Sequence, residues 1–200
     1  EEVTDMMTID LRRQIEDRLK MMRNEMDVII VSDYGKGMID QAMLNSIVEL
    51  WGEDGTVLVD PKPRGNMVYQ GVSGMTPNLS ETRQLVGDVP LKTDADVEAA
   101  AHKLVTELDM DHILITRSEQ GMTLYLKNGA CLHMPTRAVE VSEVSGAGDT
   151  VIATFAAALA TDIRVERAAH MANLAGGVVV GKLGTATAEW PELIQRNVAA

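Results

Sequence analysis

The chain has 200 residues, of which 46% are hydrophobic and 24% are charged, and its formal net charge is −12. This composition is globular and the length suits one domain over residues 1–200, while the negative charge argues against nucleic acid or an anionic membrane surface as the main partner. A single cysteine, Cys131, excludes an internal disulfide framework, and the absence of a signal peptide or an apolar run of spanning length predicts a cytoplasmic location and no membrane partner.

The first part of the chain alternates amphipathic helices with short apolar strands. Apolar residues at helical spacing predict a helix over 5–26. Val28–Val31 is a continuous apolar run, which is typical of a strand buried on both faces of a parallel sheet. By the same reasoning we expect strands at 56–60 and 112–116 and a shorter element before Thr76. Helices are expected at 39–51 and 94–108, and a further helix is expected to begin within residues 76–81.

The pattern changes after Gly121. Residues 122–126 and 130–134 flank a turn that contains a glycine, which indicates a β-hairpin. A last short strand is expected at 139–141, followed by helices at 150–160 and 165–181 and a short helix that Pro191 opens. Together the elements predict an α/β fold: a mostly parallel sheet with helices on both faces and an antiparallel hairpin at one edge.

The stretch VSEVSGAGDT, residues 141–150, joins the last expected strand to an apolar helix. Gly146 and Gly148 permit close backbone approach, and the N-terminus of the following helix favours an anion. Asp149 would repel a phosphate there, unless its task is to take a proton from an attacking hydroxyl. The stretch therefore suggests phosphoryl transfer, and an ordinary glycine-rich turn with an aspartate at the helix start is an equal alternative.

A polar loop follows each expected strand. In open α/β sheets, ligands bind beyond the carboxyl ends of the strands, so loops placed there converge on one edge. Any one of them alone is ordinary turn chemistry, but five on the same edge predict a site. The loops are residues 33–37, 60–64, 78–81, 117–121 and 145–149.

Other kinds of site are not predicted. The four histidines lack HxxxH and HxH spacing, so we expect no zinc, and Cys131 is expected to be inert packing in an apolar hairpin. Ser118 and Ser145 have no adjacent histidine base, which argues against a serine hydrolase. No GxxxxGK[ST] motif is present, which excludes a P-loop NTPase.

Seven runs carry a resemblance to a known family: SDYGKG, DPK, TPNLSE, TRSEQG, LHMPT, GAGDT and AGGVVVGKLGT. In this order they resemble the ribokinase-like (PfkB) carbohydrate kinases, and within them the D-glycero-β-D-manno-heptose-7-phosphate kinase domain of the bifunctional heptose kinase/adenylyltransferases. The resemblance covers nearly the whole chain. It implies a ribokinase-like three-layer α/β/α fold and ATP-dependent phosphorylation of O1 of the heptose 7-phosphate, in ADP-heptose synthesis for the lipopolysaccharide core.

The resemblance also implies roles for two motifs. Gly146, Ala147 and Gly148 match the family's anion hole, and Asp149 matches its catalytic base. Residues Asn78, Leu79, Ser80 and Glu81 match the NxxE motif, which organises Mg²⁺ and the phosphates of ATP. From spacing alone, an Asn78 helix cap with Glu81 closing a capping box is the stronger alternative.

Further residues are matched more weakly, each with a structural alternative. The resemblance places Thr116, Arg117 and Gly121 on the nucleotide side, and Asn173 and Gly176 at the adenine, although close helix packing explains the last two equally well. Lys36 and Lys62 would meet phosphate charge, but solvated lysines are more common. Asp33 would touch the sugar or brace its own turn.

The chain departs from the family in two respects. Glu143 stands where the family usually has aspartate, beside a monovalent-cation site, so that subsidiary site is altered. The family's front strands, its sugar-binding segment and lid, and the adenylyltransferase half have no counterpart in these 200 residues. We therefore expect an N-terminally truncated kinase domain whose exposed sheet edge favours homo-oligomers. Two alternatives stay open: a nucleotide-binding module without turnover, and a PfkB kinase for another sugar.

Overall fold

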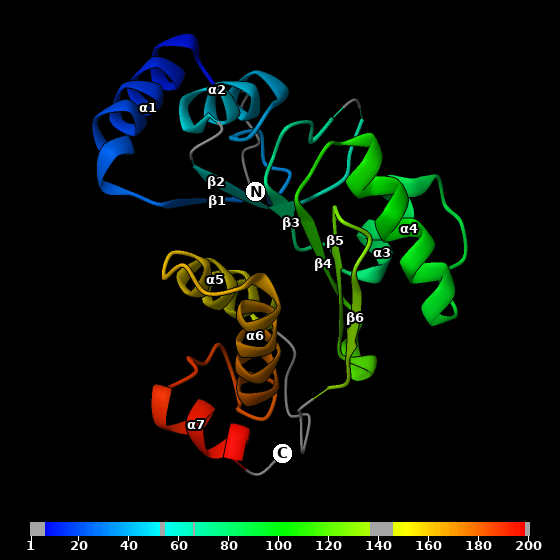
Figure 1. Ribbon diagram of the computed structural model, residues 1–200. Coiled ribbons are helices and arrows are strands. Elements are labelled where there is room, and N and C mark those ends of the chain that lie inside the picture. The colour runs from blue at the N-terminus through cyan, green and yellow to red at the C-terminus, as the bar shows by residue number, and fades with distance from the viewer. Residues whose placement is uncertain (1–6, 53–54, 66, 137–145, 199–200) are drawn as a thin grey trace.

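The computed structural model describes residues 7–52, 55–65, 67–136 and 146–198. Its middle layer is a six-stranded sheet in which the strands follow one another in chain order (Figure 1). The first four strands pair in parallel, and β5 pairs antiparallel with both β4 and β6, which confirms the expected mostly parallel sheet with a hairpin at one edge. The strands are β1 (Val28–Ser32), β2 (Thr56–Asp60), β3 (Gly74–Met75), β4 (His112–Thr116), β5 (Met122–Leu126) and β6 (Cys131–Met134).

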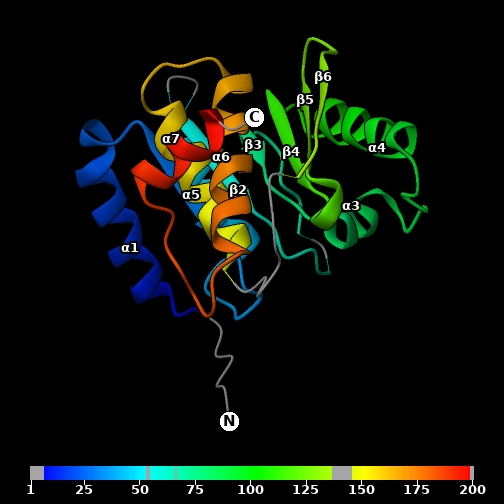
Figure 2. The same cartoon turned by 90° about the horizontal axis from the view of Figure 1, so that it is seen from below.

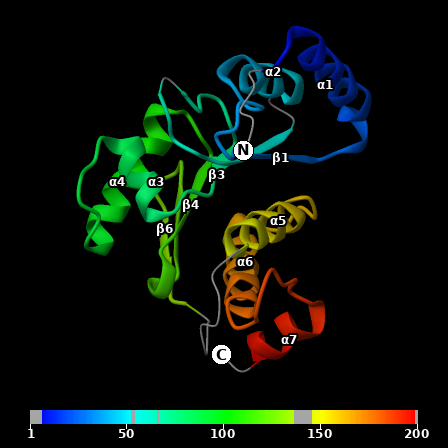
Figure 3. The same cartoon turned by 180° about the vertical axis from the view of Figure 1, so that it is seen from behind.

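Helices cover both faces of the sheet (Figures 1 and 3). On one face lie α1 (Ile9–Met22), α2 (Gln41–Trp51), α3 (Leu79–Val86) and α4 (Asp94–Glu107). On the other lie α5 (Ala147–Leu159), α6 (Val165–Val179) and α7 (Trp190–Val198), which gather into one group in Figure 2. Short 3-10 turns follow α1 at Arg23–Glu25 and β4 at Ser118–Gln120. The expected three-layer α/β/α architecture is confirmed.

Each face of the sheet has its own hydrophobic core, because successive strand side chains point to opposite faces. Val57 and Val59 of β2 pack with side chains of α2 to α4, whereas Leu58 between them packs with α5 and α6. The buried side chain of Phe155 belongs to the second core. Strands with consecutive apolar residues, such as Val57–Val59 of β2, therefore need helices on both sides.

The element boundaries differ from the expected ones in places that matter for the site. The helix expected from Thr150 begins three residues earlier, at Ala147, so the glycine turn is itself the first turn of α5. β3 has only two residues, and a Cβ on its Gly74 would lie 2.4 Å from the His112 ring. The strand expected at 139–141 falls outside the described residues.

The first strand forms an edge of the sheet. Among the described strands it pairs with β2 alone, and Ile30 on it is 37% exposed. The neighbouring α1 has no buried residue. An exposed edge was expected from the sequence, but homo-oligomer formation stays a prediction. None of the described helices has the length and apolar character needed to cross a membrane.

Candidate active site

The loops at the carboxyl ends of the parallel strands are joined to one another by backbone hydrogen bonds. The Asp33 amide donates to the Asp60 carbonyl (3.1 Å), and the Thr116 amide donates to the Pro77 carbonyl (2.9 Å). Asn78 and Thr116 also form a bridge beyond the ends of their strands. The ladder of the sheet thus continues into the loops, so the polar residues after β1 to β4 share one edge.

The first turn of α5 meets this edge. Gly146 is the residue before the helix and has φ 77° and ψ 0°, a left-handed conformation that favours glycine. The N-cap residue Gly146 offers no side-chain acceptor, so within the described residues no side chain caps the first turn of α5. The exposed Asp149 lies in that turn and accepts a hydrogen bond from the Tyr34 hydroxyl (3.0 Å). An uncapped helix N-terminus and a carboxylate therefore stand side by side, as phosphoryl transfer to a hydroxyl requires.

Asp60 is the most strongly perturbed carboxylate of the site. Burial raises its pKa to about 7, and the negative charges of Glu81, Asp149 and Asp33 add to that rise against the opposing effect of Lys62. Carboxylates gathered in this way are stabilised by a proton or by a cation among them. Asp60 lies in the polar loop 60–64 expected from the sequence, but it was not predicted as a site residue. An aspartate directly after a buried strand and before Pro61 was the available signal.

The Asn78–Glu81 motif forms a complete capping box at the start of α3. The Glu81 amide donates to Asn78 Oδ1 (2.9 Å), and the Asn78 amide donates to Glu81 Oε2 (3.0 Å). The helix cap that the sequence offered as an alternative to a metal motif is therefore present. Glu81 Oε1 faces the other way and lies 3.7 Å from Lys62 Nζ, so this carboxylate also contributes charge to the site.

Asp33 braces its own loop. Its side chain is 1% exposed, accepts a hydrogen bond from the Gly35 amide (2.8 Å) and pairs with Arg64 at 2.5 Å. Arg64 also donates to the Ile39 carbonyl (2.5 Å), so it ties the loop after β2 to the loop after β1. Sequence reasoning missed Arg64, because nothing in its spacing indicates which carboxylate it meets. Lys36 is exposed, between two glycines that both have positive φ.

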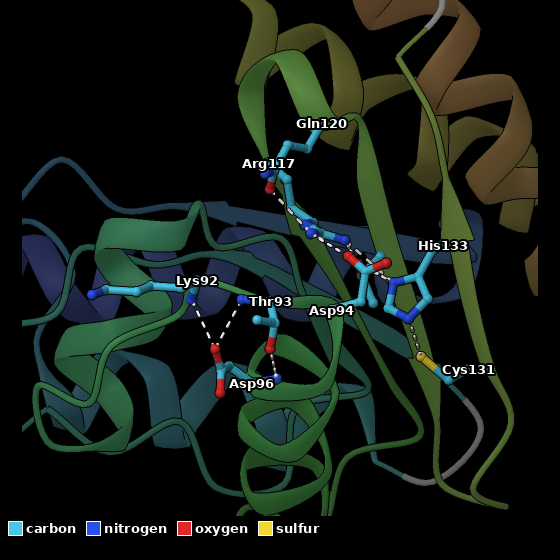
Figure 4. A network of polar contacts seen from close by, with 9 residues as sticks. Lys92, Thr93, Asp94, Asp96, Arg117, Gln120, Cys131 and His133 are labelled. Carbon is cyan, nitrogen blue, oxygen red and sulfur yellow. Dashed lines mark hydrogen bonds and ion pairs between the residues drawn. The ribbon is translucent and has the colours of Figure 1, made fainter.

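The Arg117 side chain is buried in a polar network rather than directed to the carboxyl edge (Figure 4). Its guanidinium donates to Asp94 (2.6 Å), to Gln120 (3.0 Å) and to Thr123 (3.0 Å). The loop that follows is held close to the end of β6: a Cβ on Gly121 would lie 2.0 Å from the Met134 carbonyl oxygen. Arg117 therefore positions this loop, and the nucleotide-side role expected for Thr116, Arg117 and Gly121 stays a prediction.

The two residues expected at the adenine have packing contacts. Asn173 is buried and donates to the Pro135 carbonyl (2.8 Å), which anchors the chain beyond β6 to α6. A Cβ on Gly176 would lie 3.0 Å from a Val151 methyl group, so glycine lets α6 approach α5 closely. Helix packing, the alternative left open from the sequence, accounts for Gly176, whereas Asn173 anchors the loop after β6. The altered residue Glu143 lies outside the described residues.

The fold places this chain in a structural class. Ribokinase from Thermotoga maritima superposes with a TM-score of 0.75 at 24% sequence identity, covering 90% of this chain and 59% of the ribokinase. Phosphofructokinase-2 from Escherichia coli, in complex with potassium, superposes with a TM-score of 0.83 at 18% identity, covering 97% of this chain and 63% of that enzyme. At these identities the likeness concerns the fold, which is ribokinase-like.

The sequence comparison gives the family. The profile of the pfkB family carbohydrate kinases matches residues 36–193, and the chain belongs to this family. It is 40% identical over 185 residues to the bifunctional protein HldE of Paramagnetospirillum magneticum, covering 92% of this chain and 38% of that protein. It is 46% identical over 166 residues to HldE of Pseudomonas aeruginosa, covering 83% of this chain and 34% of that protein. The chain thus spans little more than a third of the length of these curated relatives.

Proposed function

We propose that this chain transfers the γ-phosphoryl group of ATP to a sugar hydroxyl, O1 of D-glycero-D-manno-heptose 7-phosphate, in ADP-heptose synthesis. The observation that carries the proposal is the uncapped N-terminus of α5 with Asp149 in its first turn, beside the carboxylates of Asp60 and Glu81. The choice of acceptor is supported by the sequence runs shared with heptose-7-phosphate kinases and by the identity of 40–46% to HldE proteins.

In this proposal the first turn of α5 performs the transfer. The amides following Gly146, including those of Ala147 and Gly148, hold the charge that develops on the transferring phosphoryl group. A Cβ on Gly148 would meet no atom within 4 Å, so there is open space in front of this turn. Asp149 accepts the proton of the sugar hydroxyl as that oxygen attacks phosphorus.

The carboxylates next to this turn suit Mg²⁺. Asp60 and Glu81 supply the oxygen ligands that Mg²⁺ prefers, and Mg²⁺ keeps several waters, so contact through water is sufficient. The pKa of Asp60 is raised first by burial and then by the negative charges of Glu81, Asp149 and Asp33, and a divalent cation would offset those charges. Asn78 would take part through its side-chain NH2 group, which can donate to a phosphate oxygen or to a metal-bound water, since Oδ1 accepts the Glu81 amide. The bound ion would neutralise phosphate charge.

The rest of the nucleotide is placed by the surrounding loops. Lys62, 58% exposed beside Glu81, is positioned to meet a phosphate, and Lys36 is proposed to meet the phosphate of the sugar. The backbone of 116–121 would border the nucleotide, and α6 near Asn173 and Gly176 would border the adenine. A monovalent cation near residue 143 remains part of the proposal that the family resemblance supplies.

A nucleotide-binding module that lacks turnover is the alternative function. Calorimetry with Mg·ATP, combined with a product assay on heptose 7-phosphate, separates the two. Binding with product supports the kinase, and binding without product supports the module. If Mg·ATP does not bind, both proposals fail.

A further inference from the structure

Three potential metal ligands meet on the face of the hairpin that α4 covers. Cys131 and His133 are two residues apart on β6, so their side chains point to the same face of the strand. Glu98 reaches them from α4, and the Cys131 sulfur, a His133 ring nitrogen and a Glu98 oxygen all lie within 4.8 Å of one another. Among the described residues, this is the group of three potential metal ligands whose donor atoms lie close together. The proposed phosphoryl transfer does not use it.

The spacing of the two strand ligands already fits a tetrahedral ion. Cys131 Sγ lies 3.7 Å from His133 Nε2 (Figure 4). With zinc–sulfur and zinc–nitrogen bonds of about 2.3 and 2.0–2.1 Å, the sulfur–nitrogen edge of a tetrahedral site is about 3.6 Å. No movement of β6 is therefore needed. The exposed Glu98 side chain can complete the set by rotating on the surface of α4.

The second ring nitrogen of His133, Nδ1, has a hydrogen-bond partner, as the non-ligating nitrogen of a metal-bound histidine usually has. Nδ1 lies 2.9 Å from the hydroxyl oxygen of Thr123, which is fully buried. That oxygen also accepts a hydrogen bond from Arg117 (3.0 Å), and its two lone pairs allow it to accept from both nitrogens. Arg117 Nη1 also lies 3.3 Å from Nδ1 and would donate to it in the other tautomer. In the metal-binding tautomer Nδ1–H donates to Thr123 instead, and the lone pair of Nε2 points toward Cys131. Asp94 balances the charge of Arg117 at 2.6 Å.

We propose that Glu98, Cys131 and His133 form a Zn²⁺ site with a thiolate, an imidazole and a carboxylate as ligands and water in the fourth position. Sulfur and nitrogen donors select zinc over Mg²⁺, so this site is chemically distinct from the carboxylate cluster at Asp60. An ion here would fix His133 and, through Thr123, the side chain of Arg117, which positions the loop 117–121. The histidine spacing gave no signal because the partner of His133 on the strand is a cysteine and the third ligand comes from a helix.

Cobalt titration of the metal-free chain tests the proposal directly. Because Cys131 is the single cysteine of the sequence, a thiolate-to-cobalt charge-transfer band can come only from this residue. We expect one equivalent of Co²⁺ to give the band and Zn²⁺ to displace it. The substitutions C131S and H133Q should weaken Zn²⁺ binding at least about tenfold, the size of effect that even supporting residues of metal sites show. E98Q should weaken it less, and the matched controls E107Q on α4 and H170Q on α6 should bind as the unsubstituted chain does.

A second measurement needs no substitution. The rate at which iodoacetamide alkylates Cys131 should fall when Zn²⁺ is added and recover when it is chelated. Circular dichroism of the variants establishes that they are folded. The proposal is overturned if Co²⁺ gives no charge-transfer band, if Zn²⁺ leaves the alkylation rate unchanged, or if folded C131S binds Zn²⁺ as tightly as the unsubstituted chain.

Discussion

The Tyr34 hydroxyl donates a hydrogen bond to Asp149 Oδ1 across 3.0 Å and so joins the loop after β1 to the first turn of α5. The bond fixes one oxygen of the proposed base and leaves the other for the sugar hydroxyl. Tyr34 is otherwise exposed, so this contact is its clearest role. The two segments lie far apart in the sequence, and this hydrogen bond brings them together at the site.

Substitution of Tyr34 by phenylalanine should therefore slow phosphoryl transfer while leaving the chain folded. Because this hydrogen bond is exposed, its loss corresponds to about 0.5–1.5 kcal/mol, so we expect kcat to fall roughly 2- to 10-fold with the KM for ATP little changed. Y125F on β5, which removes a hydroxyl that contacts His102 of α4, is the matched control. An unchanged kcat in Y34F would remove Tyr34 from the mechanism.

Asp60 should make stability depend on pH in a defined direction. Its pKa is raised from 3.8 to about 7, so between these values the folded chain binds more protons than the unfolded chain. The contribution of this carboxyl to the free energy of unfolding is fully present below about pH 4 and is lost as the pH rises through 7. The D60N side chain cannot ionise, so this loss of stability at high pH does not occur. In metal-free buffer D60N should therefore raise the unfolding free energy at pH 8 and leave it nearly unchanged at pH 4. Denaturant titrations at both pH values measure this, with D162N as a control on an exposed aspartate. An equal effect at the two pH values would contradict the assignment.

Magnesium should offset the destabilisation that the ionised carboxylates around Asp60 cause at high pH. At pH 8 we expect Mg²⁺ to raise the melting temperature of the unsubstituted chain, because an ion that binds only the folded state stabilises it. D60N should lose most of this increase. If Mg²⁺ raises the melting temperature equally in both, Asp60 does not contribute to the ion's site.

Gly148 offers a test that separates activity from stability. A Cβ there would meet no atom within 4 Å, and alanine is a better helix former than glycine by about 1 kcal/mol. G148A should therefore keep or slightly raise the melting temperature and yet slow phosphoryl transfer, because the methyl group enters the space proposed for the phosphate. A variant with full activity would show that the phosphate lies elsewhere.

Gly121 should behave in the opposite way. It has φ 87°, and a Cβ would lie 2.0 Å from the Met134 carbonyl oxygen, which belongs to backbone and cannot move aside cheaply. We expect G121A to lower the unfolding free energy by at least about 2 kcal/mol. Urea unfolding with G148A as the comparison measures it, and a change below the error of that measurement would mean that the loop relaxes freely.

Much of the architecture was predictable because it depends on local patterns. Continuous apolar runs at 28–31, 56–60 and 112–116 specify buried parallel strands, and the glycine turn at 127–129 specifies the hairpin. The start of α5 was misplaced by three residues because a glycine-rich turn and a first helical turn have the same composition. The two-residue β3 has too few side chains to produce a pattern.

The site was predictable as a location but not as a set of contacts. Loops at strand ends share an edge by topology, so Asp33, Glu81 and Asp149 could be placed together. The ion pair of Asp33 with Arg64, the burial of Arg117 and the perturbed pKa of Asp60 all depend on how loops fold in three dimensions. Asn78 shows the same limit: its spacing fits both a helix cap and a metal motif, and the contacts establish the cap.

The exposed first strand predicts self-association. β1 is an edge strand, and Ile30 on it is 37% exposed. An unpaired edge with apolar side chains promotes pairing between copies, and a lysine on an edge opposes it. Light scattering should therefore show oligomers that I30K shifts toward the monomer. A monodisperse unsubstituted monomer would contradict this prediction.

The central claim is that Asp149 is the base of a sugar kinase, and the most direct measurement is the transfer of labelled γ-phosphate from ATP to heptose 7-phosphate. Mass spectrometry identifies the product, and calorimetry with Mg·ATP is run on the same samples. We predict a heptose bisphosphate with the unsubstituted chain and a rate at least about 100-fold lower in D149N, which should still bind Mg·ATP. Formation of product by D149N at the unsubstituted rate would contradict the account.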